Sequence, residues 1–112
     1  MSFAEFEFDA RLQRAVDELG FIAPTPVQEK AMPPALAGRD LIGLAQTGTG
    51  KSAAFILPIL QRLLGRERGH TRALIVAPTR ELVEQLSEHV AALGVHTDLR
   101  CATVYGGVKY KA

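Results

Sequence analysis

One continuous stretch of the chain, residues 40–52, decides the fold: it reads Asp40-Leu41-Ile42-Gly43-Leu44-Ala45-Gln46-Thr47-Gly48-Thr49-Gly50-Lys51-Ser52. A short apolar run ends at Leu44, and a turn that is rich in glycine follows it. Residues 53–60 are then almost entirely apolar. This order predicts a strand, a tight turn and a buried helix, because glycine adopts the backbone conformations that a tight turn requires and because a helix that is apolar on all sides is buried.

The turn has the pattern of a P-loop, which holds the phosphates of a nucleoside triphosphate. Gly48 and Gly50 let backbone N–H groups point inward, and the following helix adds its positive N-terminal end. Lys51 is then predicted to reach the β- and γ-phosphates, and the Ser52 hydroxyl to ligate Mg²⁺. Ala45 replaces the first glycine of the pattern, which a turn tolerates where φ is negative. The alternative is a glycine-rich turn with an unrelated lysine.

Helices and strands are predicted to alternate along the chain. Prolines at 33, 34 and 58 should end or kink the helices that contain them, because the proline ring clashes with the preceding turn. Cys101 is interpreted as a core residue of the last strand. Helices are expected between an Asp9 cap and Gly20, from Thr25-Pro26 to before Gly38, from about Gly50 to about Leu64 and from Thr79 through Leu93, and strands at 40–44, 73–77 and 99–104.

This alternation predicts an α/β fold, a P-loop NTPase domain with a parallel sheet. Parallel strands that are joined through helices need right-handed crossovers, and their apolar runs are buried on both faces. Ligands bind such sheets at the carboxyl ends of the strands. The P-loop, Pro78-Thr79-Arg80 and Gly106-Gly107 all follow predicted strands, so we expect them to lie together at that edge.

The composition limits the class of protein. The chain has 112 residues, enough for one small domain, and it holds no run of 18 apolar residues that could span a membrane. The acidic N-terminus is unlike a signal peptide, and the single cysteine, Cys101, excludes an internal disulfide. We therefore expect a cytoplasmic protein without a membrane partner. The net charge is only +1, so a nucleic-acid partner must be argued from local motifs.

Four motifs resemble, in order and spacing, those of the first RecA-like domain of DEAD-box RNA helicases. They are similar to the Q motif, motif I, motif Ia and the glycine doublet of that family. The resemblance spans residues 6–107, so the chain (1–112) is interpreted as part of that domain, incomplete at its C-terminal side. The motifs are the Q motif at about 6–28, which includes Phe21-Ile22-Ala23-Pro24-Thr25-Pro26-Val27-Gln28, the P-loop at 45–52, Pro78-Thr79-Arg80-Glu81-Leu82, and Gly106-Gly107.

The resemblance implies that ATP and Mg²⁺ are bound. Gln28 would read the N6/N7 edge of adenine, and Phe6 would stack on the base. An alternative for Gln28 is a capping box with Thr25 at the start of a helix. An alternative for Phe6 is a buried N-terminal anchor, and Phe3 and Phe8 compete with it for the stacking role. The nucleotide-binding residues implied are Phe6, Phe21, Thr25, Gln28, Ala45, Gln46, Thr47, Gly48, Thr49, Gly50, Lys51 and Ser52.

The resemblance also implies that single-stranded RNA is bound through its backbone. Free N–H groups at the start of the helix that follows Thr79, together with the Arg80 side chain, would hold a phosphate. Such contacts carry little sequence specificity. The alternatives are a helix cap followed by a solvated arginine, a simple turn at the glycines and, for the basic stretch 65–72, a solvated loop. The RNA-binding residues implied are Pro78, Thr79, Arg80, Glu81, Gly106 and Gly107.

Several parts of the family pattern are missing from the 112 residues. They contain no Asp-Glu-Ala-Asp box, no Ser-Ala-Thr motif and no second helicase domain. We therefore expect an ATP-dependent RNA helicase as the intact parent, with the missing C-terminal domain as a partner, and adenine nucleotide binding without turnover by the chain alone. The alternatives are a non-catalytic nucleotide- and RNA-binding module, and a P-loop NTPase that acts on DNA or on a small molecule.

Overall fold

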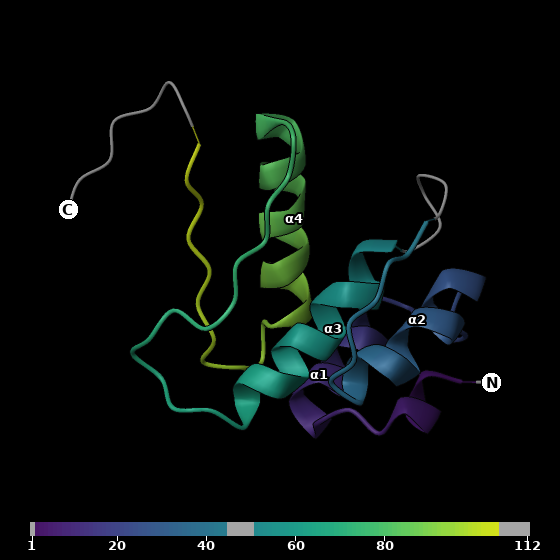
Figure 1. Cartoon of the computed structure of the whole chain (residues 1–112). Coiled ribbons are helices and arrows are strands. Elements are labelled where there is room, and N and C mark those ends of the chain that lie inside the picture. The colour runs from purple at the N-terminus through teal and green to yellow at the C-terminus, as the bar shows by residue number, and fades with distance from the viewer. Residues whose placement is uncertain (1, 45–50, 106–112) are drawn as a thin grey trace.

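The structure is a computed structural model that describes residues 2–44 and 51–105 (Figure 1). Within these ranges the four predicted helices are confirmed, and none is long and apolar enough to cross a membrane. The first six residues of the P-loop and Gly106-Gly107 lie outside the described residues. The elements are the 3-10 helix η1 (Phe3–Phe6) and the helices α1 (Ala10–Glu18), α2 (Pro26–Leu36), α3 (Lys51–Leu64) and α4 (Arg80–Leu93).

Local side-chain hydrogen bonds explain where the helices begin. The Asp9 carboxylate accepts from the Arg11 backbone N–H at 2.9 Å at the start of α1. The Thr79 hydroxyl accepts from the Leu82 N–H at 3.1 Å at the start of α4. Each oxygen satisfies an N–H group that has no partner within the helix. Gly20, just beyond α1, has φ +78°, a conformation that glycine adopts without steric cost.

The prolines at 33, 34 and 58 lie inside helices and do not end them at the proline itself. Helix α2 continues past Pro33-Pro34 to Leu36 and ends before Gly38, as predicted. Pro58 is buried inside α3, which extends from Lys51 to Leu64.

Helix α3 forms the centre of the molecule. It packs most extensively against α2 and also contacts α1 and α4, as Figure 1 shows. Ile56 and Leu57 of α3 are almost fully buried, together with Leu12 of α1 and Met32 of α2. Burial of side chains of this size contributes about 1.5–3 kcal/mol each. The packing of α2 on α3 therefore fixes the position of the Q-motif helix relative to the helix that follows the P-loop.

A cluster of phenylalanines fastens the N-terminus to this core. Phe3, Phe6 and Phe8 are all buried. The Phe3 ring lies 5.8 Å from Phe6 and 5.6 Å from Phe21, and Phe6 lies 5.7 Å from Phe8, measured between ring centroids. Such aromatic pairs each contribute about 0.5–1.5 kcal/mol beyond the area that they bury.

The parallel sheet is not confirmed. Residues 40–44, 71–77 and 98–105 have no strand assignment in the described part of the chain. In Figure 1 all three run toward the same end of the molecule, but they do not form a ladder. A strand requires hydrogen bonds to a specific neighbour, and segments that are consecutive in sequence are not always neighbours in a sheet. The apolar pattern therefore predicts extended backbone here without specifying its partner.

These extended segments expose several large apolar side chains. Ile75 and Ala77 pack against the core, whereas Leu74 is 84% and Val76 82% exposed. This alternation is that of extended backbone with one face on the core. Cys101 is also exposed, so the prediction that it is a core residue is wrong. It lies in the last extended segment, which has no strand on either side of it among the described residues. The other large apolar side chains that these segments expose are Leu41, Ile42, Leu44 and Val104.

Candidate functional site

The last two P-loop residues begin α3. Lys51 is the first residue of the helix and is exposed, and Ser52 is half-buried. The first N–H groups of a helix lack intrahelical partners, and the helix dipole adds positive charge at this end. The Lys51 side chain adds a further positive charge at this end of the helix. A cation here destabilises the helix by itself, but it favours the binding of an anion. Ala45 to Gly50, the rest of the predicted phosphate loop, lie outside the described residues.

Gln28 lies on α2 and is only 2% exposed. The Thr25 backbone N–H donates to Gln28 Oε1 at 2.9 Å, and the Gln28 N–H donates to Thr25 Oγ1 at 3.4 Å. The capping-box interpretation is therefore confirmed. It is compatible with adenine binding, because an amide oxygen accepts two hydrogen bonds and the amide nitrogen donates two. Recognition of adenine by Gln28 stays a prediction.

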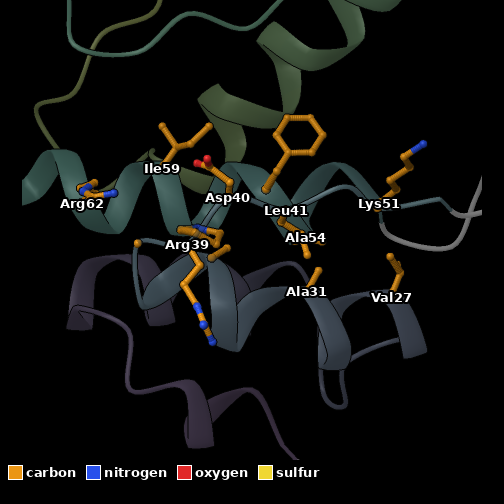
Figure 2. Close-up of a pocket in the computed structure, with 14 residues that line it drawn as sticks. Val27, Ala31, Arg39, Asp40, Leu41, Lys51, Ala54, Ile59 and Arg62 are labelled. Carbon is orange, nitrogen blue, oxygen red and sulfur yellow. The ribbon is translucent and has the colours of Figure 1, made fainter.

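A groove of about 350 Å³ runs between α2 and α3. In Figure 2, Lys51 and Val27 lie at one end of the groove and Arg62 at the other. Arg39 and Asp40, from the segment that leads to the P-loop, lie between these ends. Val27, the residue before Gln28, and Lys51 of the P-loop therefore line the same end of this groove.

Phe6 and Phe21 have structural partners. Phe6 is 9% exposed and packs between Phe3 and Phe8, as the anchor interpretation predicts. Phe21 is half-buried and lies against the Phe3 ring. The stacking of Phe6 on adenine stays a prediction, and the structure gives Phe3 and Phe8 no greater exposure for that role.

Thr79 and Arg80 stand at the start of α4, and both are exposed. The Thr79 hydroxyl caps the helix, as the alternative interpretation requires. Pro78 and Glu81 on either side of this pair are exposed as well. The capping role leaves the phosphate-binding prediction open, because the cap satisfies one N–H group of the first turn and the others still point out of the helix end.

Tyr105 was not among the residues expected to act, and the structure brings it to Arg80. The guanidinium carbon of Arg80 lies 4.9 Å from the centroid of the Tyr105 ring. The Tyr105 hydroxyl donates to Glu84 Oε1 at 2.9 Å. One signal in the sequence points to this tyrosine, since it directly precedes the glycine doublet. Gly106 and Gly107 themselves lie outside the described residues.

One arginine of the basic stretch at 65–72 makes hydrogen bonds to residues outside the stretch. Arg68 donates through Nε to Asp98 Oδ1 at 2.9 Å and through a terminal nitrogen to the Leu63 carbonyl at 3.0 Å. The Arg68 side chain lowers the pKa of the Asp98 carboxyl, chiefly through the hydrogen bond. Arg68 therefore joins the loop after α3 to the segment after α4. Arg66, His70 and Arg72 are exposed, as in a solvated loop.

The comparisons with known proteins agree on one family. The sequence profile of the DEAD/DEAH box helicases matches residues 25–112. The chain is 50% identical to the ATP-dependent RNA helicase SrmB of Escherichia coli strain K12, over 97% of this chain and 25% of that protein. It is 47% identical to the DEAD-box ATP-dependent RNA helicase RhpA of Helicobacter pylori, over 98% of this chain and 22% of that protein. The chain thus spans about a quarter of the length of these curated relatives.

A solved structure shows the same arrangement. The RNA-helicase Prp28 from Chaetomium thermophilum, crystallised with ADP, superimposes with a TM-score of 0.87 at 38% sequence identity. The match covers 96% of this chain and 27% of that chain.

Proposed function

Because the chain belongs to the DEAD/DEAH box helicase family, we propose that it is the ATP-binding portion of an ATP-dependent RNA helicase. The interpretation drawn from the four motifs is thereby confirmed at the level of the family. The relatives SrmB and RhpA are named as ATP-dependent RNA helicases, and the Prp28 structure carries ADP. In the proposed protein, residues 1–112 are part of a RecA-like α/β domain with a parallel sheet.

The observation that carries the nucleotide proposal is the packing of α2 on α3. Gln28 lies on α2, and Lys51 and Ser52 begin α3. Because the two helices pack against each other, these residues belong to one helix pair. Gln28 would select adenine with its amide, and Lys51 would hold the β- and γ-phosphates. The Ser52 hydroxyl, at the second position of α3, is a hard oxygen ligand of the kind that Mg²⁺ accepts beside phosphate oxygens. Bound Mg²⁺ would neutralise phosphate charge.

The RNA proposal rests on the start of α4. Thr79 and Arg80 are exposed at the positive end of this helix, where a phosphate of a single strand would be held by N–H groups and by the guanidinium. Pro78, Glu81 and Gly106-Gly107 would complete this contact with the backbone. Binding would fall steeply with salt and discriminate poorly between sequences.

We propose further that the chain alone binds nucleotide without turnover. ATP hydrolysis needs acidic residues that hold Mg²⁺ and place water. The acidic residues after Ser52 do not form an Asp-Glu pair behind an apolar run; they are Glu67, Glu81, Glu84, Glu88 and Asp98. The single cysteine fits a cytoplasmic location.

The first test is calorimetric titration of the chain with AMP, ATP and GTP in the presence of Mg²⁺, alongside a phosphate-release assay. The expected result is binding that prefers adenine nucleotides, without released phosphate. Equal affinity for ATP and GTP would contradict adenine recognition, and released phosphate would contradict the proposal of binding without turnover. Titration with RNA and DNA of the same sequence separates this proposal from an NTPase that acts on DNA.

A further inference from the structure

One aromatic side chain joins two turns of α4 at its N-terminal end. The Tyr105 ring faces the Arg80 guanidinium at 4.9 Å, and its hydroxyl donates to Glu84 at 2.9 Å. Arg80 and Glu84 are four residues apart on one helix, so they lie on the same face, one above the other. Tyr105 comes from the last extended segment, which ends at the same end of the molecule as the start of α4 (Figure 1). The ring thus spans the first turn of α4.

Two costs oppose a fixed position of the Arg80 side chain. Arg80 is the first residue of α4, where the helix dipole is positive and where a cation is disfavoured. The side chain is long and exposed, so holding it in one place costs rotamer entropy. The face of an aromatic ring attracts a guanidinium, and this attraction offsets part of both costs. The bond from the Tyr105 hydroxyl to Glu84 fixes the ring against the helix.

We propose that Tyr105 is a positioning residue for RNA binding that acts through Arg80. Its ring holds the guanidinium over the start of α4, where Arg80 and the first N–H groups of the helix meet one phosphate of the strand. Glu84 acts one step further away, by fixing the tyrosine. This inference rests on the proposed function, in which Arg80 contacts RNA. It adds to that function a tyrosine and a glutamate that the motif pattern does not include.

The test is a double-mutant cycle on Arg80 and Tyr105, with a labelled single-stranded RNA of mixed sequence as the probe. We expect Arg80→Ala to weaken RNA binding roughly tenfold. The slope of log affinity against log salt concentration should become shallower by the amount that about one phosphate contact contributes. Tyr105→Ala should weaken binding roughly threefold, in keeping with the loss of a cation–π contact. Tyr105→Phe keeps the ring but loses the bond to Glu84, so its affinity should lie between those of the wild type and Tyr105→Ala. In the Arg80→Ala background, Tyr105→Ala should have no further effect, because the residue acts through Arg80.

A second measurement examines the contact without RNA. The Arg80 Nε–H resonance should show a ring-current shift that Tyr105→Ala abolishes and Tyr105→Phe retains. Arg14→Ala is the matched charge control, since Arg14 lies exposed on α1 and pairs with Glu18. It should leave RNA affinity nearly unchanged. Circular dichroism checks that each variant keeps its helix content.

The outcomes separate the two proposals. If Arg80→Ala leaves RNA affinity unchanged, the proposed RNA contact fails and the role of Tyr105 fails with it. If Arg80→Ala weakens binding and Tyr105→Ala does not, only the role of Tyr105 is overturned. A loss from Tyr105→Ala that persists in the Arg80→Ala background means that Tyr105 contacts RNA directly, for example by stacking on a base, which also overturns positioning.

Discussion

The Asp9 backbone N–H donates to Gln61 Oε1 at 2.7 Å, although the two residues are 52 positions apart in the sequence. Asp9 is also the cap of α1, and Gln61 lies on α3. This one residue therefore starts a helix with its carboxylate and ties that helix to the centre of the molecule with its N–H group. The N-terminal segment that the Q motif includes is thus fixed to the helix that follows the P-loop.

The Asp9 carboxylate gives the first prediction, a loss of stability in acid. Hydrogen bonds from the Arg11 side chain and backbone lower the pKa of Asp9 from 3.8 to about 2. A folded-state pKa below the unfolded value means that the stabilisation is present above the unfolded pKa and is lost as the pH falls toward the folded one. Asp9→Asn keeps a capping oxygen but does not titrate. Its urea midpoint should fall less than that of the wild type between about pH 4 and about pH 2; equal falls would assign the acid sensitivity to other carboxylates.

Lys51→Ala should abolish triphosphate binding without unfolding the chain. The lysine is a cation at the positive end of α3, so its removal should leave the helix unchanged or stabilise it by about 0.3–1 kcal/mol. Calorimetry with ATP and urea denaturation measure the two effects separately. Lys30→Ala, at an exposed position of α2, is the matched control and should bind ATP normally. Retained ATP affinity in Lys51→Ala would contradict the P-loop assignment.

Gln28→Ala separates adenine recognition from helix capping. Loss of the capping box should lower the free energy of unfolding, and this loss alone should weaken ATP and GTP binding equally. Loss of a bidentate contact to adenine should cost about 1–3 kcal/mol for ATP alone. We expect the second pattern on top of the first. Gln13→Ala is the glutamine control, because Gln13 lies on α1 and its side chain donates to Asp17 of the same helix, not to a residue of α2. Equal losses for both nucleotides would mean that Gln28 only caps α2.

The helices could be predicted because their signals are local. Asp9, Thr25 and Thr79 cap the helices that follow them, and the apolar residues of α1 and α4 recur with helical spacing. The strands could not be established in this way. The apolar run at 73–77 predicts extended backbone, but pairing depends on segments that are distant in the sequence.

The candidate site shows the same division between local and distant signals. The capping of Gln28 by Thr25 follows from four neighbouring residues, and the structure confirms it. The contact of Tyr105 with Arg80 joins two separate segments and leaves no local pattern. Phe3, Phe6 and Phe8 are spaced by three and then by two residues, which fits no single helical or strand period, and only the packing shows that all three are buried.

The exposed apolar face of the extended segments should make the isolated chain self-associate. Leu74 and Val76 are largely exposed, next to backbone without a strand partner in the described ranges. Extended apolar segments with unpaired edges are sites of strand addition between molecules. Val76→Lys should keep the chain monomeric, in sedimentation measurements, at concentrations at which the wild type associates. Val95→Lys is the control, because Val95 is exposed outside these segments. If both variants behave as the wild type, association does not use this face.

Thr79→Ala should destabilise the start of α4. The Thr79 hydroxyl accepts from the Leu82 N–H, and its loss leaves that group without its cap. The expected cost is about 1 kcal/mol in the free energy of unfolding, measured by urea denaturation, and Thr79→Ser should restore most of it. Hydrogen exchange gives the local readout. The Leu82 amide should lose protection in Thr79→Ala, while the Leu86 amide, one turn further into the helix, keeps it. Unchanged protection at Leu82 would contradict the capping role, because it would show that water or another group replaces the Thr79 hydroxyl.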